Sequence, residues 1–173
     1  MKKLNNILKI CAVVLLASIV VSSCKKDEDS TASYTPEKEA ALIKEWLDAM
    51  VKSNKDIDTT ATGLFYIVDK EGTGETVKTG DEVTVKYTGM FLNGSVFDAS
   101  AYHSEAGTYT YIHKDTDMSK RMITGWEEGI EVMKKGGVSA FLIPSAKAYG
   151  PTGSMSIPPY CPLIFVIEVV DIK

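Results

Sequence analysis

Side chains that commonly act as nucleophiles or metal ligands are scarce in this sequence of 173 residues. It contains two histidines and three cysteines, and Cys11, Cys24 and Cys161 lie far apart. A zinc site needs three or four such ligands, usually at short, regular spacings, so a metal site is not expected. The sequence also lacks a glycine-rich phosphate loop and a nucleophile–base motif. It therefore predicts no metal and no cofactor.

The remaining candidates for a site are aromatic side chains and one carboxylate. Tyr87 and Phe165 lie in segments with strand character, and Trp126 lies at helical spacing from its apolar neighbours. Taken singly, each of these rings fits an ordinary packing role, and Asp98 fits a turn or a cap. A functional site must therefore be argued from several segments of the chain together.

Composition and charge restrict the class of protein. Apolar residues make up 45% and charged residues 24% of the chain, as in ordinary globular proteins. The net charge of -4 at pH 7 argues against a protein that binds nucleic acid through phosphate attraction. No apolar run reaches 18 residues, so a mature transmembrane helix is not expected.

The N-terminal segment has the pattern of a secretory signal peptide, predicted over residues 1–23. Residues 1–9 hold three lysines and no acid, and residues 10–21 are apolar. The run ends in Val21-Ser22-Ser23-Cys24, which resembles the lipobox of bacterial lipoproteins. This resemblance implies lipidation of Cys24 and anchoring in the cell envelope, in the outer membrane on its periplasmic face or at the cell surface. The alternative is ordinary secretion with Cys24 as a thiol.

A polar tether and a helix follow. Residues 24–35 are polar and show no hydrophobic pattern, which predicts a flexible spacer or, from their acidic run, a surface-export signal. Thr35-Pro36-Glu37 then fits a helix start, and an apolar stripe continues to Val51, so an amphipathic helix is expected over 36–54. The stripe could pack on a second copy of the chain or on the domain that follows. A helix this short favours packing within a monomer.

The remainder of the chain has mostly strand signals. Asn93-Gly94 predicts a hairpin turn, and residues 71–74 predict another turn. Helical spacing from Ile123 to Met133 predicts one short helix that stops at Gly136-Gly137. About five strands and one helix indicate an α+β fold, the strands being expected at 64–68, 83–87, 109–111, 138–143 and 163–172.

Several of these segments, taken in order, resemble the FKBP family of peptidyl-prolyl cis-trans isomerases. The resemblance covers residues 61–173 and implies a twisted antiparallel sheet wrapped around one short helix. The motifs that carry it are Val85-Lys86-Tyr87-Thr88-Gly89, Phe97-Asp98-Ala99-Ser100, Ile123-Thr124-Gly125-Trp126-Glu127-Glu128-Gly129, Ala148-Tyr149-Gly150, Ile157-Pro158-Pro159 and the strand from Leu163 to Val169.

The family site is a shallow apolar pocket between the helix and the sheet, with Trp126 matching its floor. By matched segments, the resemblance implies as catalytic residues Tyr87, Phe97, Asp98, Trp126, Tyr149 and Phe165. It implies as substrate-binding residues Tyr109, Met122, Ile123 and Ile157. Because the family binds the macrolides tacrolimus and rapamycin in this pocket, it also predicts macrolide binding.

The chemistry implied is rotation about the peptide bond before proline, in proteins that are folding after export. Resonance sets a barrier of roughly 18–20 kcal/mol to this rotation, and an apolar site lowers it by binding the twisted imide better than either planar form. In the family, groups matching the Ile123 N–H and the Tyr149 hydroxyl bind ligand carbonyls, and Asp98 takes an electrostatic role. The alternative function is a non-catalytic chaperone or protein-binding module that uses the same groove.

The sequence departs from the family pattern in two loops. Residues 113–121 form an insertion of about four residues that replaces a short Leu-Gly turn, and Met122 replaces a valine. The loop from Gly150 to Ile157 is about one residue shorter than common forms. His103 and His113 lie in loop-like stretches and are expected to be solvated.

Overall fold

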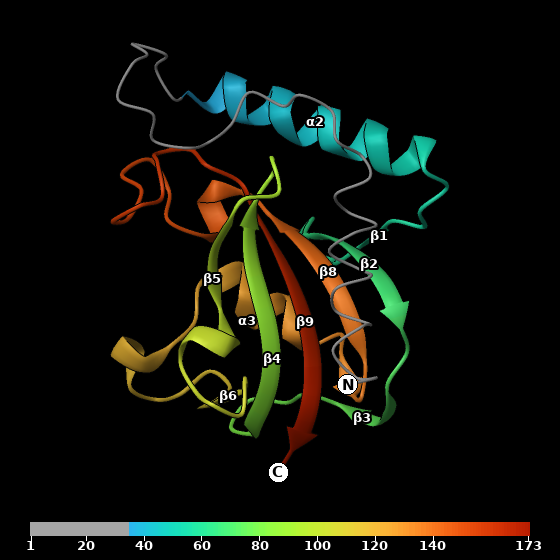
Figure 1. Ribbon diagram of the computed structural model, residues 1–173, viewed down its shortest axis with the longest axis vertical. Coiled ribbons are helices and arrows are strands. Elements are labelled where there is room, and N and C mark those ends of the chain that lie inside the picture. Colours follow the sequence, from blue (N-terminus) through green and yellow to red (C-terminus); the bar gives the residue numbers. More distant parts are fainter. Residues whose placement is uncertain (1–34) are drawn as a thin grey trace.

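The computed structural model describes residues 35–173, which form an α+β domain built on one twisted antiparallel sheet (Figure 1). The predicted signal peptide, the tether and Cys24 lie outside the described residues. The sheet has seven strands, in the order β1-β2-β8-β9-β4-β5, with β6 paired to β4. Their bounds are β1 Asp58–Thr59, β2 Phe65–Lys70, β4 Glu82–Phe91, β5 Val96–Ala99, β6 Tyr109–Ile112, β8 Val138–Ile143 and β9 Leu163–Ile172.

Smaller elements complete the described chain. Strands β3 (Thr73–Thr76) and β7 (Lys134–Lys135) pair with each other. The helices are α2 (Pro36–Lys52), α3 (Thr124–Ile130) and the single 3-10 turns η1 (Ser100–Tyr102), η2 (Met118–Lys120) and η3 (Ser145–Lys147). No helix among residues 35–173 is long and apolar enough to cross a membrane.

The sequence-based fold class is confirmed, and the sheet has more strands than the five expected. The additional strands β1 and β5 are two and four residues long, too short to show the alternation that identifies a strand. The turn predicted at residues 71–74 is partly wrong, since Thr73 begins β3 and pairs with Lys135. Such pairing depends on a partner about sixty residues away along the chain and leaves no local signal.

Strand β9 lies at the centre of the sheet, between β8 and β4. Its side chains alternate between two buried layers, with Phe165 and Ile167 on one face and Ile164 and Val166 on the other. This explains why its first five residues are all apolar, because a strand covered on both faces has no solvent side, whereas Glu168 and Asp171 belong to its less buried second half.

Helix α3 packs closely on β8 because glycines face that strand. A Cβ atom at Gly125 would lie 2.4 Å from the Ile143 side chain, and one at Gly129 would lie 2.8 Å from the Phe141 ring. The helix ends at Ile130, so the expectation that it continues to Gly136-Gly137 is wrong. The chain leaves the helix early because Lys134 and Lys135 pair with β3.

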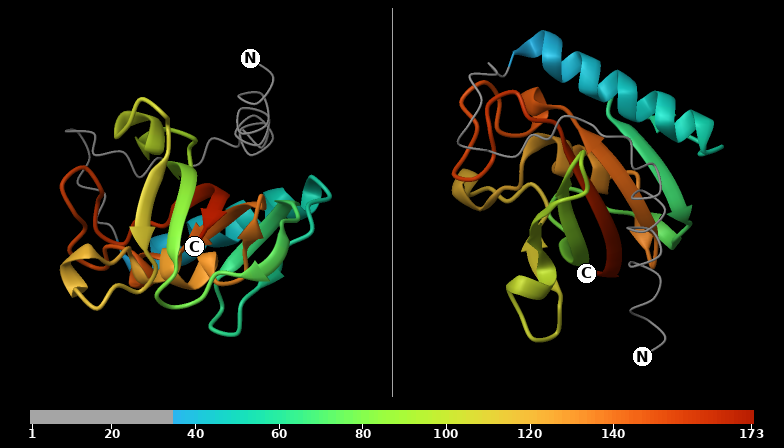
Figure 2. Two further views of the ribbon diagram at one scale, coloured as in Figure 1. Left: turned by 90° about the horizontal axis from the view of Figure 1, so that it is seen from below. Right: turned by 45° about the horizontal axis from the view of Figure 1, so that its top comes forward.

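Helix α2 begins as the sequence predicts, with the Thr35 hydroxyl accepting a hydrogen bond from the backbone N–H of Lys38. It packs on the domain that follows, where Trp46, Ala49 and Met50 are buried against the sheet face opposite α3. Figures 1 and 2 show α2 lying across the sheet at the end where β4 finishes. Most of the apolar stripe is thus covered within one chain, whereas Val51 at its end is 63% exposed.

Candidate active site

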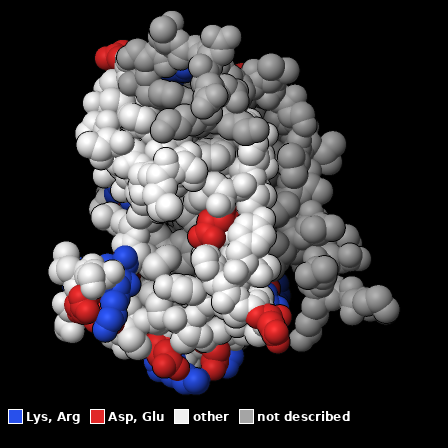
Figure 3. All heavy atoms as spheres, turned by 60° about the vertical axis from the view of Figure 1, so that its left-hand side comes forward, with Lys and Arg blue, Asp and Glu red and all other residues white. Residues whose placement is uncertain are grey.

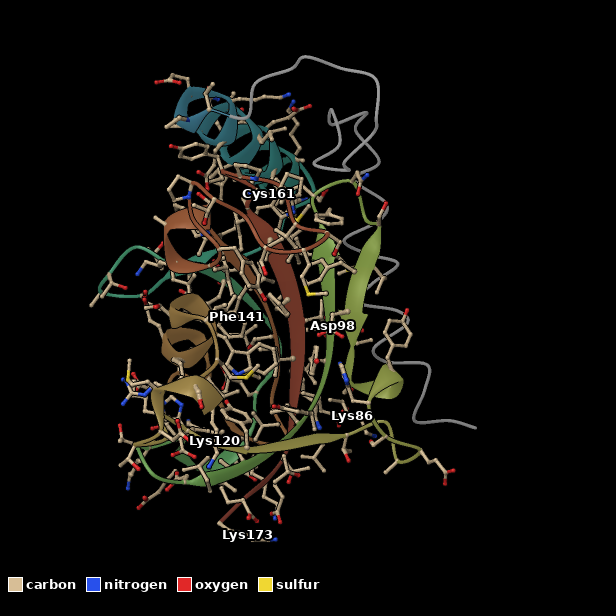
Figure 4. All side chains as sticks on the ribbon, turned by 90° about the vertical axis from the view of Figure 1, so that its left-hand side faces the viewer. Lys86, Asp98, Lys120, Phe141, Cys161 and Lys173 are labelled. Atoms are coloured by element: carbon tan, nitrogen blue, oxygen red, sulfur yellow. The ribbon has the colours of Figure 1, made fainter. Side chains whose placement is uncertain are left out.

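A cavity of about 250 Å³ opens between α3 and the sheet. Its lining comes from β4, β5, α3, β9 and the loops before α3 and after η3. Figure 4 shows Asp98 beside the sheet and Phe141 next to α3. The lining residues are Tyr87, Phe97, Asp98, Arg121, Met122, Ile123, Trp126, Tyr149 and Phe165.

Trp126 lies at the centre of the site and is completely buried. Its indole N–H donates a 2.8 Å hydrogen bond to the Tyr111 hydroxyl, which fixes the ring orientation. The rings of Tyr87 and Phe165 meet it edge-on, with centroids 5.1 and 5.3 Å away and interplanar angles near 90°. These edge-to-face contacts are the favoured geometry for aromatic pairs, so the walls and floor of the cavity support one another.

Gly89 allows two of the rings to approach each other. A Cβ atom at this position of β4 would lie 2.8 Å from both the Phe97 and the Phe165 ring. Those rings stand edge-to-face at 5.5 Å. A larger residue at position 89 would displace one of them, which explains why the Tyr-Thr-Gly sequence of β4 carries a glycine on the site face.

Asp98 is the carboxylate of the cavity, and three groups hold it. The Tyr87 hydroxyl donates a 2.8 Å hydrogen bond to Oδ2, and the Ala99 backbone N–H donates one of 2.8 Å to Oδ1. The Nε2 atom of His103 also lies 2.7 Å from Oδ1. Burial, followed by the hydrogen bond to Asp98, raises the pKa of Tyr87 well above its usual range, so this hydroxyl remains a donor.

Two hydrogen-bond donors at the cavity have no acceptor within the part of the chain that the structure describes. Within residues 35–173, no group accepts a hydrogen bond from the backbone N–H of Ile123 or from the Tyr149 hydroxyl. Burial, with a smaller contribution from the charge of Asp98, raises the pKa of Tyr149, which therefore stays protonated at neutral pH. Both groups are available to bind the carbonyl oxygens of a ligand.

The inserted loop is held at both of its ends by one buried carboxylate. Glu127 of α3 accepts hydrogen bonds from the backbone N–H groups of Lys114, at 3.0 Å, and Met122, at 3.1 Å. Its Oε2 atom also lies 2.6 Å from Nδ1 of His113, which is completely buried, so the expectation of a solvated His113 is wrong. The insertion is thus tied to the helix that carries Trp126.

The structure brings most of the predicted site residues together at the cavity. The exceptions are Ile157, which is buried in the adjoining core, and Tyr109, whose ring meets Tyr87 edge-on at 6.2 Å without lining the cavity. The sequence reasoning missed Arg121 at the cavity and the contact of His103 with Asp98. Neither residue has a local pattern that would have marked it, because both belong to irregular segments.

The distribution of charged side chains on the surface agrees with an apolar ligand. In the space-filling view, uncharged side chains dominate the middle of the visible face, and most of the charged ones gather at its lower end (Figure 3). Within residues 35–173, histidine, cysteine and acidic side chains form no group of three that could hold a metal ion. The cavity is lined by aromatic rings, the side chains of Met122 and Ile123, the cation Arg121 and one carboxylate, Asp98.

Comparison with known families agrees with this geometry. The model of the FKBP-type peptidyl-prolyl cis-trans isomerase domain matches residues 73–170. The chain belongs to this family. Among curated relatives, a probable FKBP-type isomerase of Haemophilus influenzae is 42% identical over 69% of this chain and 46% of its own length. The isomerase FkpA of Escherichia coli is 36% identical over 83% of this chain and 52% of its own length.

The solved structures show the same fold. The crystal structure of Escherichia coli FkpA superposes with a TM-score of 0.61 at 26% identity, covering 99% of this chain and 90% of the other. A peptidyl-prolyl isomerase of Pseudomonas syringae superposes with a TM-score of 0.65 at 23% identity, covering 85% and 99%. The chain spans about half the length of the curated relatives that it matches.

Proposed function

We propose that this protein is a peptidyl-prolyl cis-trans isomerase that assists the folding of exported proteins. The observation that carries the proposal is the meeting of an aromatic cavity, a held carboxylate and two unpartnered donors at one place. Family membership supports the same activity. The substrate class is a polypeptide with an X-Pro bond, whose ring would lie over Trp126.

Catalysis of this kind requires no covalent bond to break. The imide loses resonance as it twists, and its carbonyl then depends less on water, so a dry aromatic cavity favours the twisted form over the planar ones. The rings of Tyr87, Trp126 and Phe165 supply that surface. The cavity is smaller than the roughly 300–1,000 Å³ of a typical drug-sized site, which suits a single prolyl ring with its neighbours outside.

The polar groups orient the substrate. The Ile123 N–H and the Tyr149 hydroxyl would each bind a carbonyl oxygen next to proline. These hydrogen bonds would hold one side of the X-Pro bond in place while the other side rotates. Asp98 would act through its field on the turning carbonyl, and it need not accept a proton because no proton moves in the reaction. The mechanism therefore needs no residue outside the cavity.

The test is the cis-trans exchange rate of a short X-Pro peptide with wild-type protein and the D98A plus Y149F double variant. We expect acceleration by the wild type and a loss of at least tenfold in the double variant, with an unchanged circular dichroism spectrum. Tyr102 is exposed and outside the cavity, so Y102F serves as the control and should keep full activity. No acceleration by the wild type with several X residues would contradict the proposal.

A second candidate, proline-independent binding of unfolded chains, is favoured by exposed apolar side chains on two loops. Met118 belongs to the inserted loop and is 71% exposed, and Met155 follows Tyr149 in the chain and is 97% exposed. Suppression of aggregation that persists in the D98A plus Y149F variant would support this function. Suppression that disappears with the isomerase activity would exclude it as a separate function.

Three finer proposals concern anchoring, ligands and assembly. Cys24 would be lipidated and hold the protein in the cell envelope, at the outer membrane; metabolic labelling with palmitate, lost in C24A, tests this. The pocket would bind tacrolimus and rapamycin, which inhibition of the peptide assay tests. The protein would be monomeric, because Trp46, Ala49 and Met50 of α2 are already buried within the chain, and light scattering of the purified protein tests this.

A further inference from the structure

The carboxylate of Asp98 is in contact with one imidazole side chain, that of His103. His103 lies just after η1, and its Nε2 atom is 2.7 Å from Oδ1 of Asp98. The other contacts of this carboxylate are the Tyr87 hydroxyl and the Ala99 backbone N–H. Within residues 35–173, no lysine or arginine forms an ion pair with Asp98, although Arg121 lines the same cavity, and His103 is the basic side chain in direct contact with the carboxylate.

The imidazole is held in this place from two sides. Its ring stacks on Tyr87 of β4 with centroids 6.4 Å apart, and it meets the Tyr109 ring of β6 at 6.3 Å. The titratable groups that face His103 are therefore Asp98 from β5, Tyr87 from β4 and Tyr109 from β6. Of these kinds of side chain, imidazole is the one whose charge ordinarily changes between pH 5 and 8.

We propose that His103 is a positioning residue that acts through Asp98 and makes substrate binding at the cavity stronger as the pH falls. The proposal rests on the proposed function, since it concerns the same cavity. A neutral imidazole can donate a hydrogen bond to Oδ1, whereas a protonated one keeps that bond and also offsets the negative charge of the carboxylate. His103 thus controls the charge that a substrate meets beside Tyr87 and Phe97.

The direction of the pH effect on KM follows from the partial charges of the substrate. Carbonyl oxygens on either side of proline carry partial negative charge, and an uncompensated carboxylate at the cavity opposes their approach. Protonation of His103 removes this opposition and should lower KM. The side chains of His103 and Asp98 are 47% and 35% exposed, so solvent screening limits the effect to about two- to fivefold.

The experiment measures kcat and KM by NMR exchange spectroscopy on an uncharged X-Pro peptide, from pH 5.5 to pH 8. We expect KM of the wild type to fall about two- to fivefold as the pH is lowered. In H103R the charge is permanent, so KM should stay at the low value throughout, and in H103Q it should stay at the high value. E105Q makes the same unit change of charge as H103R at an exposed residue of the same loop, and it should follow the wild-type profile.

Two results would overturn the inference while leaving the isomerase activity in place. One is a wild-type KM that does not change with pH, and the other is an H103R profile with the wild-type slope. The peptide dissociation constant, measured from amide shifts in the same samples, separates this failure from that of the proposed function. Binding with the expected pH pattern but without exchange would support the role of His103 and contradict catalysis, whereas absence of binding at every pH would overturn both.

Discussion

The two faces of the central sheet are built from alternate residues of the same strands, yet the cavity described above opens on the α3 face. On one face, Phe165 and Ile167 of β9 lie under α3. On the other face, Ile164 and Val166 lie under α2. Alternation along the strand is equal for both faces, so the difference comes from the helix that covers each one.

The two helices differ in placement and in length. Helix α2, with 17 residues, lies across the strands at one end of the sheet (Figure 1). Helix α3, with 7 residues, spans about 10 Å at about 1.5 Å per residue, whereas β9 with 10 residues extends about 33 Å. The cavity opens beside this short helix, where the rings of Tyr87, Trp126 and Phe165 line it.

The largest effect on stability is expected on the face under α2, where Trp46 anchors this helix. Truncation in W46A should cost about 3–5 kcal/mol of the free energy of unfolding, measured by urea denaturation, because the helix loses its main contact. The indole Nε1 is buried without a hydrogen-bond partner among the described residues, so W46F should lose much less. Equal losses in both variants would contradict this expectation and show that a phenyl ring cannot replace the packing of the indole.

Glu39 connects α2 to the segment that leads to Tyr149 of the cavity. Its carboxylate, on α2, accepts hydrogen bonds from the Ser145 backbone N–H, at 2.5 Å, and hydroxyl, at 2.6 Å. Ser145 begins η3, which leads directly to Tyr149. E39A should cost about 1.5–3 kcal/mol in unfolding free energy and should also raise KM for an X-Pro peptide.

A matched control variant tests whether the contact between Glu39 and Ser145 influences KM as well as stability. Lys44 and Asp48 form an exposed pair on the same helix, so D48A serves as the control and should change neither quantity. A normal KM in E39A, despite the loss of stability, would show that α2 stabilises the domain without influencing the active site.

Gly129 of α3 lies against β8 on the face that holds the cavity, so a substitution there tests how the position of α3 affects the site. In G129A the new Cβ would meet the Phe141 ring, so α3 must move away from β8, at a cost of about 1–3 kcal/mol in unfolding free energy. Because Trp126 moves with the helix, kcat/KM should fall more than in W46A, once corrected for the folded fraction. A variant with reduced stability and unchanged kcat/KM would contradict the close link between helix position and site.

The smallest effect on the free energy of unfolding is expected from protonation of Glu128 of α3. Burial raises the pKa of its carboxyl, but hydrogen bonds from Lys147, Thr60 and Thr62 outweigh burial and lower it overall. A carboxyl with a lowered pKa in the folded state stabilises the protein above its ordinary titration range and loses this contribution as the pH falls.

Comparison of E128Q with the wild type measures that contribution. The variant should be less stable by about 1 kcal/mol or less at pH 7, and the two proteins should approach equal stability at pH 3, in urea denaturation at each pH. A difference that is constant from pH 7 to pH 3 would show that charge on Glu128 contributes nothing to stability.

The sequence alone predicted the long elements well and the short ones poorly. Strands β8 and β9 lie where their apolar runs indicated, because continuous burial leaves a strong pattern. The pairing of β3 with β7 and the early end of α3 were missed, since both depend on a partner distant in the chain. Motif resemblance placed Tyr87, Trp126 and Phe165 in one site, which periodicity could not have done.

What the sequence by itself determined is the set of side chains: the aromatic rings, the glycines of α3 and β4, and the apolar stripe of α2. Only the tertiary structure decided which polar groups are satisfied. His113 became buried beside Glu127, His103 came to lie against Asp98, and the Ile123 N–H was left without a partner among the described residues. The physical reason is that burial and hydrogen-bond partners arise from residues far apart in the chain, whereas helix and strand periodicity is local.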